Sequence, residues 1–330
     1  MSAVLISKFT NLPRADLPAS SGAAFAVLNR VRSKLRQNWL KHIGRKYWQS
    51  HGLVSSEEFY HTIHEAVVQK TPLAVGRLGG VEASIVMWAK GIPSCPWRPD
   101  LWPIFADTAY GATNAGIRPR NRESYRAFAD LAWEALEGLD LQGVWSAGHE
   151  SACLQMLGLR SLFNGEITGP DGENPNHWMR SLQGKRVLVV SPFFGTIDKQ
   201  IPKLSAVWPK MPWLEETYFE MVPFPYLIDE ECSETWWEVY NRIGAIVSRG
   251  DYDVALFGCG GLGLLFAHLA KKAGRVGIHL GGHLQLIFGI YGQRHLEQEW
   301  HRKHINEAWV RPGGNEVPVS AKRVEGGCYW

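Results

Sequence analysis

The chain has 330 residues, 45% of them hydrophobic and 20% charged, with a formal net charge of +3. This composition excludes disordered, collagen-like and coiled-coil chains and is that of a globular protein with one large α/β domain or two smaller ones. Residues 1–55 hold nine Lys and Arg and one acid, a net of +8, whereas the rest holds 26 basic and 31 acidic residues, a net of −5. An acidic body lacks the broad basic face that nucleic acid requires, so we expect no nucleic-acid partner.

Membrane and disulfide classes are also disfavoured. No uncharged apolar run reaches the ~18 residues of a membrane span, and the N-terminal residues lack the apolar core of a signal peptide. The five cysteines are widely spaced, with no CxxC or Cys/His pairing, so they indicate neither a disulfide framework nor a zinc site. We therefore expect a cytoplasmic protein.

The first predicted element is a basic amphipathic helix over residues 23–48. Its apolar residues recur at steps of three and four and share one face: Leu28, Val31, Leu35, Trp39 and Ile43. The same stretch carries seven basic residues and no acid. Two interpretations stay open: peripheral contact with an anionic membrane surface, or packing on the domain with a solvated basic face.

After this helix, short apolar runs alternate with helical patterns, which indicates βαβ units. We predict a Rossmann-like α/β fold with a mostly parallel sheet and helices on both faces. Strands are expected over residues 72–75, 143–147, 186–191, 253–257 and 275–280. Helices are expected over 81–90, 122–136, 150–157 and 262–273. We interpret residues 1–55 as an N-terminal extension and 56–330 as one α/β domain.

A glycine-rich turn between the fourth of these strands and the helix that follows matches G-x-G-x-x-G. Its glycines are Gly258, Gly260, Gly261 and Gly263. Such a turn lets backbone approach a phosphate at a helix N-terminus, although it can equally be a structural tight turn. Binding of NAD is disfavoured, because the next strand ends in Gly281-Gly282-His283 instead of the acid that would hold an adenosine ribose.

Other strand ends supply polar groups. Arg77, with Gly79 and Gly80, follows the first strand and could neutralise a phosphate, and Glu82 stands in the first turn of the next helix. The structural alternatives are a buried salt bridge for Arg77 and a favourable helix-terminal position for Glu82.

Histidines also follow strands. His149 and Glu150 are candidate general bases, with helix capping as the alternative for Glu150. His283 is a candidate substrate or phosphate contact, with a hydrogen-bonded structural histidine as the alternative.

Four short motifs together resemble the GT-D-fold glycosyltransferases over residues ~70–290. They are Arg77-Leu78-Gly79-Gly80-Val81-Glu82, Asn114-Ala115-Gly116-Ile117-Arg118-Pro119, the run 254–260, and Ile278-His279-Leu280-Gly281-Gly282-His283. The resemblance implies a Rossmann-like enzyme that transfers a sugar from a nucleotide-sugar donor to a glycan or lipid-linked acceptor, in cell-envelope polysaccharide synthesis. It adds Asn114 to the donor-binding residues.

The first motif departs from the family pattern, which has Asp-x-Glu. Gly80 stands in place of the Asp, so Glu82 is the one acid left. One alternative is a divalent cation, Mg²⁺ or Mn²⁺, held by Glu82 and the donor diphosphate. The other is metal-free transfer, in which Arg77 and the backbone amides of the glycine turn stabilise the leaving diphosphate and Glu82 or Glu150 is the base. Two other functional classes stay open: an NAD(P)-dependent oxidoreductase, and a non-catalytic nucleotide-sugar-binding protein.

Overall fold

The computed structural model describes residues 52–91, 114–144, 153, 157–158, 161–229 and 231–330. The basic helix expected over 23–48 lies outside these residues, as do His149 and Glu150. Within the described ranges, no helix combines the length and the apolar character needed to cross a bilayer.

The centre of the domain is a seven-stranded parallel sheet, in the order β3-β2-β1-β7-β6-β4-β5. Its strands are β1 (Leu73–Arg77), β2 (Leu141–Val144), β3 (Leu162–Asn164), β4 (Arg186–Ser191), β5 (Tyr218–Pro223), β6 (Val254–Phe257) and β7 (Val276–His279). Strands β2, β6 and β7 are buried along their whole length, as strands of a parallel sheet covered on both faces are. The sheet register pairs Val75 with Ile278, which puts the carboxyl ends of β1 and β7 side by side.

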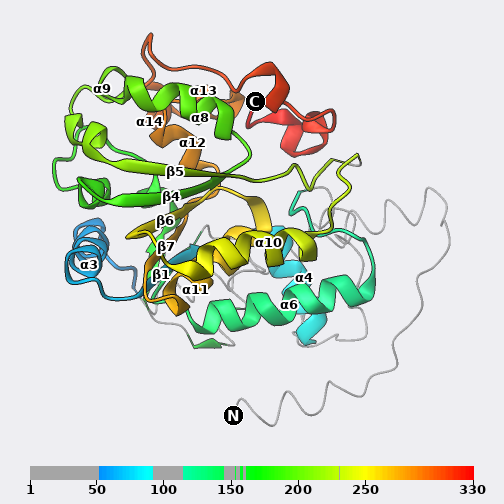
Figure 1. Ribbon diagram of the computed structural model, residues 1–330. Coiled ribbons are helices and arrows are strands. Elements are labelled where there is room, and N and C mark those ends of the chain that lie inside the picture. Colours follow the sequence, from blue (N-terminus) through cyan, green and yellow to red (C-terminus); the bar gives the residue numbers. More distant parts are fainter. Residues whose placement is uncertain (1–51, 92–113, 145–152, 154–156, 159–160, 230) are drawn as a thin grey trace.

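Helices cover both faces of the sheet (Figure 1). One face carries α4 (Gly80–Lys90), α6 (Arg122–Glu137), α10 (Trp236–Arg249) and α11 (Gly263–Lys272). The other carries α3 (Ser56–Gln69), α8 (Phe194–Gln200), α9 (Leu204–Val207), α12 (His283–Ile287), α13 (Gln293–Glu297) and α14 (Glu299–Arg302). Short 3-10 helices occupy Gly165–Thr168, Trp178–Leu182, Ile201–Lys203, Pro212–Glu216, Gly260–Leu262, Gly314–Glu316, Ala321–Arg323 and Glu325–Gly327. The predicted Rossmann-like α/β class is therefore confirmed.

The sheet separates two hydrophobic cores. Because successive side chains of a strand point to opposite faces, Ala255 and Phe257 of β6 belong to the core under α4, α6, α10 and α11, whereas Val254 and Leu256 belong to the other core. A strand of this kind needs apolar residues at every position, which is why β6 reads as a continuous apolar run.

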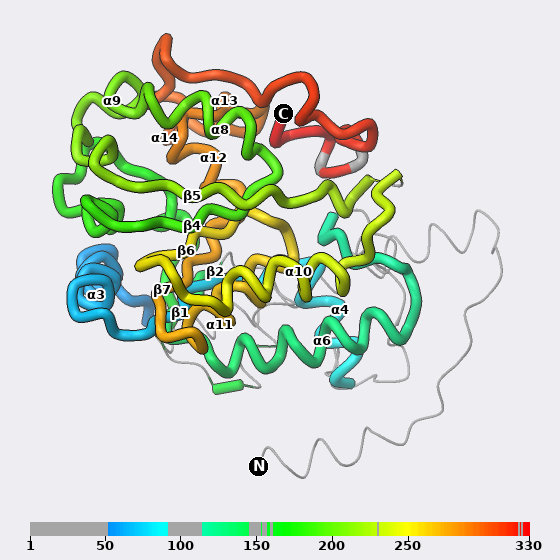
Figure 2. The backbone as a smooth tube through the Cα atoms, viewed as in Figure 1, coloured from blue at the N-terminus to red at the C-terminus, as the bar shows by residue number. Residues whose placement is uncertain are grey.

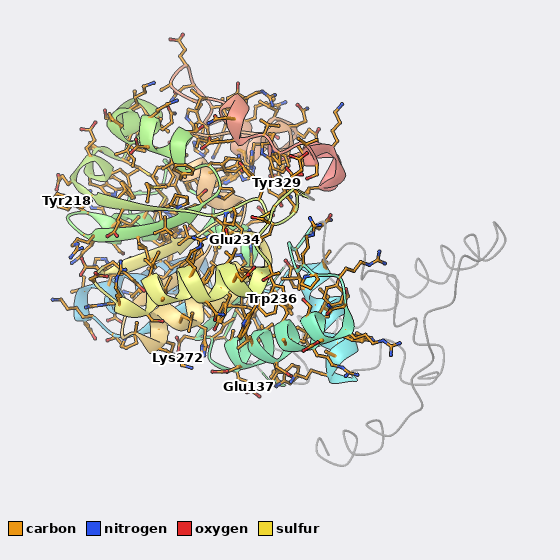
Figure 3. All side chains as sticks on the ribbon, turned by 45° about the vertical axis from the view of Figure 1, so that its right-hand side comes forward. Glu137, Tyr218, Glu234, Trp236, Lys272 and Tyr329 are labelled. Carbon is orange, nitrogen blue, oxygen red and sulfur yellow. The ribbon has the colours of Figure 1, made fainter. Side chains whose placement is uncertain are left out.

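Local sequence sets where α10 and α6 begin. Thr235 and Glu238 form a reciprocal capping box at the start of α10, and Gly250 ends that helix in the left-handed conformation. At the start of α6, the Asn121 side chain accepts a hydrogen bond from the Ser124 amide. The buried Trp236 then joins the two helices, because its indole N–H donates to Ser124 Oγ at 2.7 Å (Figure 3).

The expected elements that fall within the described residues agree with the observed ones to within a few residues, whereas the helix expected over 150–157 lies mostly outside those residues. Two kinds of difference are found. The strand expected over 143–147 begins earlier, at Leu141, because Gln142 and Gly143 pair with β1 at Gly76 and Arg77. The expected elements do not include strands β3 and β5 or helices α3, α8, α9, α10, α12, α13 and α14. Strand β5 lies at the edge of the sheet and is largely solvent-accessible, so it lacks the apolar run that marks the inner strands.

The C-terminal segment folds back onto the domain, and the chain ends beside α8 and α13 (Figure 2). The buried carboxylate of Glu316 accepts hydrogen bonds from the amides of Gly195 and Thr196 in the first turn of α8. The main-chain oxygen of Trp330 accepts from the Gln293 amide at 3.3 Å, and its indole donates to Glu316 O at 3.0 Å. These contacts make the last residues part of the folded body.

Candidate functional site

Residues from separate segments meet at the carboxyl edge of the sheet, around the turn that follows β6. The amide of Gly261 donates to the carbonyl of Ala115 at 3.3 Å, which sets Asn114 next to the glycine turn. Glu82 reaches the same turn, since its Cγ and Oε1 lie 3.3 Å from where a Cβ on Gly261 would stand. The fold thus brings three of the predicted motifs together.

The four glycines of the turn have different structural roles. Gly260 has φ +54°, a conformation that L-residues rarely adopt. A Cβ on Gly263 would lie 2.3 Å from Cδ2 of His279, so this glycine permits close packing of α11 on β7. A Cβ on Gly258 would lie 2.6 Å from Cδ2 of Leu284. Packing therefore accounts for Gly258 and Gly263, while contact of Gly260 and Gly261 with a ligand stays a prediction.

Arg77 supports the loop after β7. Its Nη2 donates to the carbonyl of Leu280 at 2.5 Å and lies 2.5 Å from where a Cβ on Gly281 would stand. Burial lowers the pKa of His279 to about 3, and the positive charge of the nearby Arg77 guanidinium contributes to this lowering. Arg77 thus adds a fixed positive charge directly behind the Gly281 backbone.

Glu82 lies in the first turn of α4, with its carboxylate folded toward the helix N-terminus. Its Oε2 lies 2.2 Å from where a Cβ on Gly79 would stand, so a larger residue at Gly79 would displace this carboxylate. A Glu at this position can bond back to the N-terminal backbone, as in a capping box. No group of three His, Cys, Asp or Glu ligands includes Glu82 within the described ranges. A cation at Glu82 stays a prediction.

A pocket of about 150 Å³ opens beside these residues, over the ends of β4, β5, β6 and β7. This volume corresponds to about five waters at liquid density, which suits one sugar or nucleobase ring better than a whole nucleotide sugar. Asn114, Gly258, Gly260 and Gly281 line one side of it. The lining also includes five aromatic residues: Phe193, Phe224, Tyr226, Tyr329 and Trp330. Figure 3 places Tyr329 in the C-terminal segment.

The aromatic wall was not foreseen from the sequence. Tyr329 and Trp330 reach the pocket only because the C-terminal segment folds back, and a Cβ on Gly282 would lie 2.7 Å from Cε1 of Tyr329. In the sequence, the aromatic pair at the end of the chain is the feature that could have indicated this contact, but no residue spacing relates that pair to β7.

His283 follows β7 but packs toward the turn after β3. The residue is 6% exposed, and its Nδ1 lies 2.8 Å from Oγ1 of Thr168. Its Nε2 lies 3.7 Å from Oε2 of Glu166. Burial, followed by the charge of Arg77, holds the pKa of His283 well below its usual range, so the ring is neutral. This environment agrees with the structural alternative for His283, and its contact with a donor stays a prediction.

Comparisons of the chain with protein-family models, with curated proteins and with solved structures found no match. The fold and the geometry of the site are therefore the observations from which a function can be inferred.

Proposed function

We propose that the protein is a glycosyltransferase that uses a nucleotide-sugar donor and a glycan or lipid-linked acceptor. The observation that carries the proposal is the convergence of Glu82, Asn114 and the 258–261 turn beside an aromatic-lined pocket at the carboxyl edge of a parallel sheet. Ligands of open α/β sheets bind at this edge. Aromatic faces suit the apolar faces of sugar and base rings.

In this proposal one ring of the donor enters the pocket, and the diphosphate lies against Gly260 and Gly281. Arg77 acts from behind Gly281 as a fixed positive charge that favours the developing diphosphate anion. The oxygen of the acceptor hydroxyl bonds to the anomeric carbon of the donor sugar, and Glu82 accepts the proton of that hydroxyl. The bond from that carbon to the diphosphate breaks, and the electron pair leaves with the phosphate oxygen.

The first experiment identifies the ligand class. Thermal unfolding of the full-length protein is followed with UDP-, GDP- and dTDP-sugars and with NAD(P)H, each at millimolar concentration. We expect a rise in Tm with at least one nucleotide sugar and none with NAD(P)H, because no acid follows β7 to hold the ribose. A rise with NAD(P)H alone would assign the site to an oxidoreductase and overturn the proposal.

The second experiment tests the base. Glu82→Gln removes the proton acceptor while keeping its shape, so sugar transfer to the acceptor should fall at least about 100-fold with the Tm nearly unchanged. The matched control is Glu123→Gln, at an exposed acid in the first turn of α6, which should leave transfer unchanged. Undiminished turnover in Glu82→Gln would remove Glu82 from the mechanism. Donor binding without transfer in the wild-type protein would indicate a binding protein instead.

A further inference from the structure

Three metal-ligating side chains from distant parts of the chain meet on the sheet face that carries α12. They are Glu166 after β3, His283 at the start of α12 and His301 in α14, and their ligand atoms all lie within 4.8 Å of one another. The shortest printed separation, from His283 Nε2 to Glu166 Oε2, is 3.7 Å. Two ligands of one tetrahedral Zn²⁺ stand about 3.4 Å apart, so small side-chain rotations would close the site.

The hydrogen bonds of Thr168 orient His283 toward the centre of this cluster. The Thr168 hydroxyl donates to the Gly165 carbonyl at 2.9 Å, and a hydroxyl has one proton to donate. For the 2.8 Å contact with His283 to be a hydrogen bond, Nδ1–H of the ring must donate to Thr168 Oγ1. The tautomer that results presents the Nε2 lone pair toward Glu166. Metal-bound histidines have this arrangement, with the other ring nitrogen donating to an oxygen.

His301 provides a second, independent indication that this cluster binds an ion. Its side chain is buried, with 5% of its surface exposed, and neither ring nitrogen has a hydrogen-bond partner within the part of the chain that the structure describes. Its ring stands 5.6 Å from the ring of His283, nearly perpendicular to it. A buried imidazole with no hydrogen bond loses the interactions that water would offer it, and a metal ion would restore one.

We propose that Glu166, His283 and His301 bind a divalent transition-metal ion, with Zn²⁺ as the best match, and leave a fourth coordination position open. Two imidazoles and one carboxylate are a ligand set of zinc sites that keep one position for water or substrate. Half of the Glu166 side chain is exposed, which gives the ion a path from solvent. The site is independent of the proposed function and does not include Glu82.

The surrounding charge determines what the fourth ligand is. Two arginines lie near this cluster: Arg77 donates to the carbonyl of Leu280, three residues before His283, and Arg294 lies in α13, between the helices that carry His283 and His301. A bare dication would be repelled by these guanidinium groups, so the open position takes an anion, either hydroxide or an oxyanion such as phosphate. Arg294 stacks 4.9 Å from the ring centroid of Tyr329, which lines the pocket.

The test is direct metal binding by the full-length protein after chelator treatment. Zn²⁺ is titrated in competition with a chromophoric chelator, and Co²⁺ is followed by its visible absorption, which reports a tetrahedral site. We expect one Zn²⁺ per chain and a Co²⁺ spectrum, with no competition from millimolar Mg²⁺, because Mg²⁺ prefers oxygen ligands. An affinity for Zn²⁺ no greater than that of the variants below would overturn the proposal.

The variants separate the site from surface binding. His301→Phe keeps an aromatic ring and loses no described hydrogen bond, so it should fold without metal and bind Zn²⁺ at least about 100-fold more weakly. Glu166→Gln, at a half-exposed position, should weaken binding similarly and serves if His301→Phe fails to fold. His304→Phe, the same substitution three residues later, should leave the affinity unchanged. Equal loss in His304→Phe, or no loss in Glu166→Gln and His301→Phe, would contradict the assignment.

Discussion

The buried His177 shows how neighbouring groups determine the protonation state of a histidine ring. His177 is 1% exposed, and its Nε2 lies 2.9 Å from the Gly169 carbonyl, which can only accept. Its Nδ1 accepts from the amide of Met179 at 3.2 Å. Both nitrogens are therefore satisfied by one neutral tautomer, and a second proton would face the Met179 N–H. Burial, partly opposed by the Gly169 hydrogen bond, lowers the pKa of His177 to about 4.

This pKa predicts a loss of stability in acid. In the unfolded chain the pKa of His177 is that of an ordinary histidine, 6.5. Between pH 6.5 and 4 the unfolded state thus binds a proton that the folded state does not, and the free energy of unfolding falls as the pH drops through that window. From pH 7.5 to 5 the loss from His177 is about 2 kcal/mol. Urea unfolding at both pH values should show a smaller drop in His177→Gln than in wild type. Substitution of the exposed His61 should leave the drop unchanged, and equal drops in all three proteins would contradict the assignment.

At the scale of elements, two helices begin with a glycine whose surroundings differ: one glycine is tightly packed and the other has open space beside it. Gly263 opens α11 against the buried ring of His279, whereas a Cβ on Gly80, which opens α4, would meet nothing within 4 Å. Gly263→Ala should therefore lower the free energy of unfolding by about 1–3 kcal/mol through overpacking. Gly80→Ala should leave it unchanged or raise it by up to about 1 kcal/mol, because Ala favours helix. The urea midpoints of the two variants measure the difference in their free energies of unfolding. Equal midpoints would show that α11 can move away from β7 without loss of stability.

At the scale of the whole molecule, the uneven charge distribution predicts a separable membrane contact. The +8 segment over residues 1–55 precedes a body with a net charge of −5. Near an anionic bilayer each Lys or Arg contributes about 1 kcal/mol, and salt screens the attraction. Deleting residues 1–51 removes the same charge and keeps Ser55, which caps α3, so it should reduce sedimentation with phosphatidylserine vesicles at low salt while nucleotide-sugar binding persists. Vesicle binding that is absent in both proteins, or equal in both, would assign the segment to packing alone.

The inner strands were predictable because parallel strands buried on both faces favour continuous apolar runs, as in β6 and in residues 187–190 of β4. Edge strand β5 was not predicted, because its residues alternate between more and less exposed and both of its ends are exposed. Helix α10 had a usable signal in Thr235 and Glu238, whose spacing is that of a capping box, followed by Val239, Ile243 and Val247 on one face. Local physics was thus sufficient for that helix.

By itself, the sequence determined the α/β class, the position of the glycine turn and the strand ends that carry Arg77 and Glu82, because periodicity and turn chemistry are local properties. Tertiary structure alone decided which of these residues meet. It set Glu82 and Ala115 against Gly261, and it folded Trp330 over the pocket. It also gathered Glu166, His283 and His301 from three separate elements. These contacts depend on strand order and on the path of the C-terminal segment, which no spacing along the chain encodes.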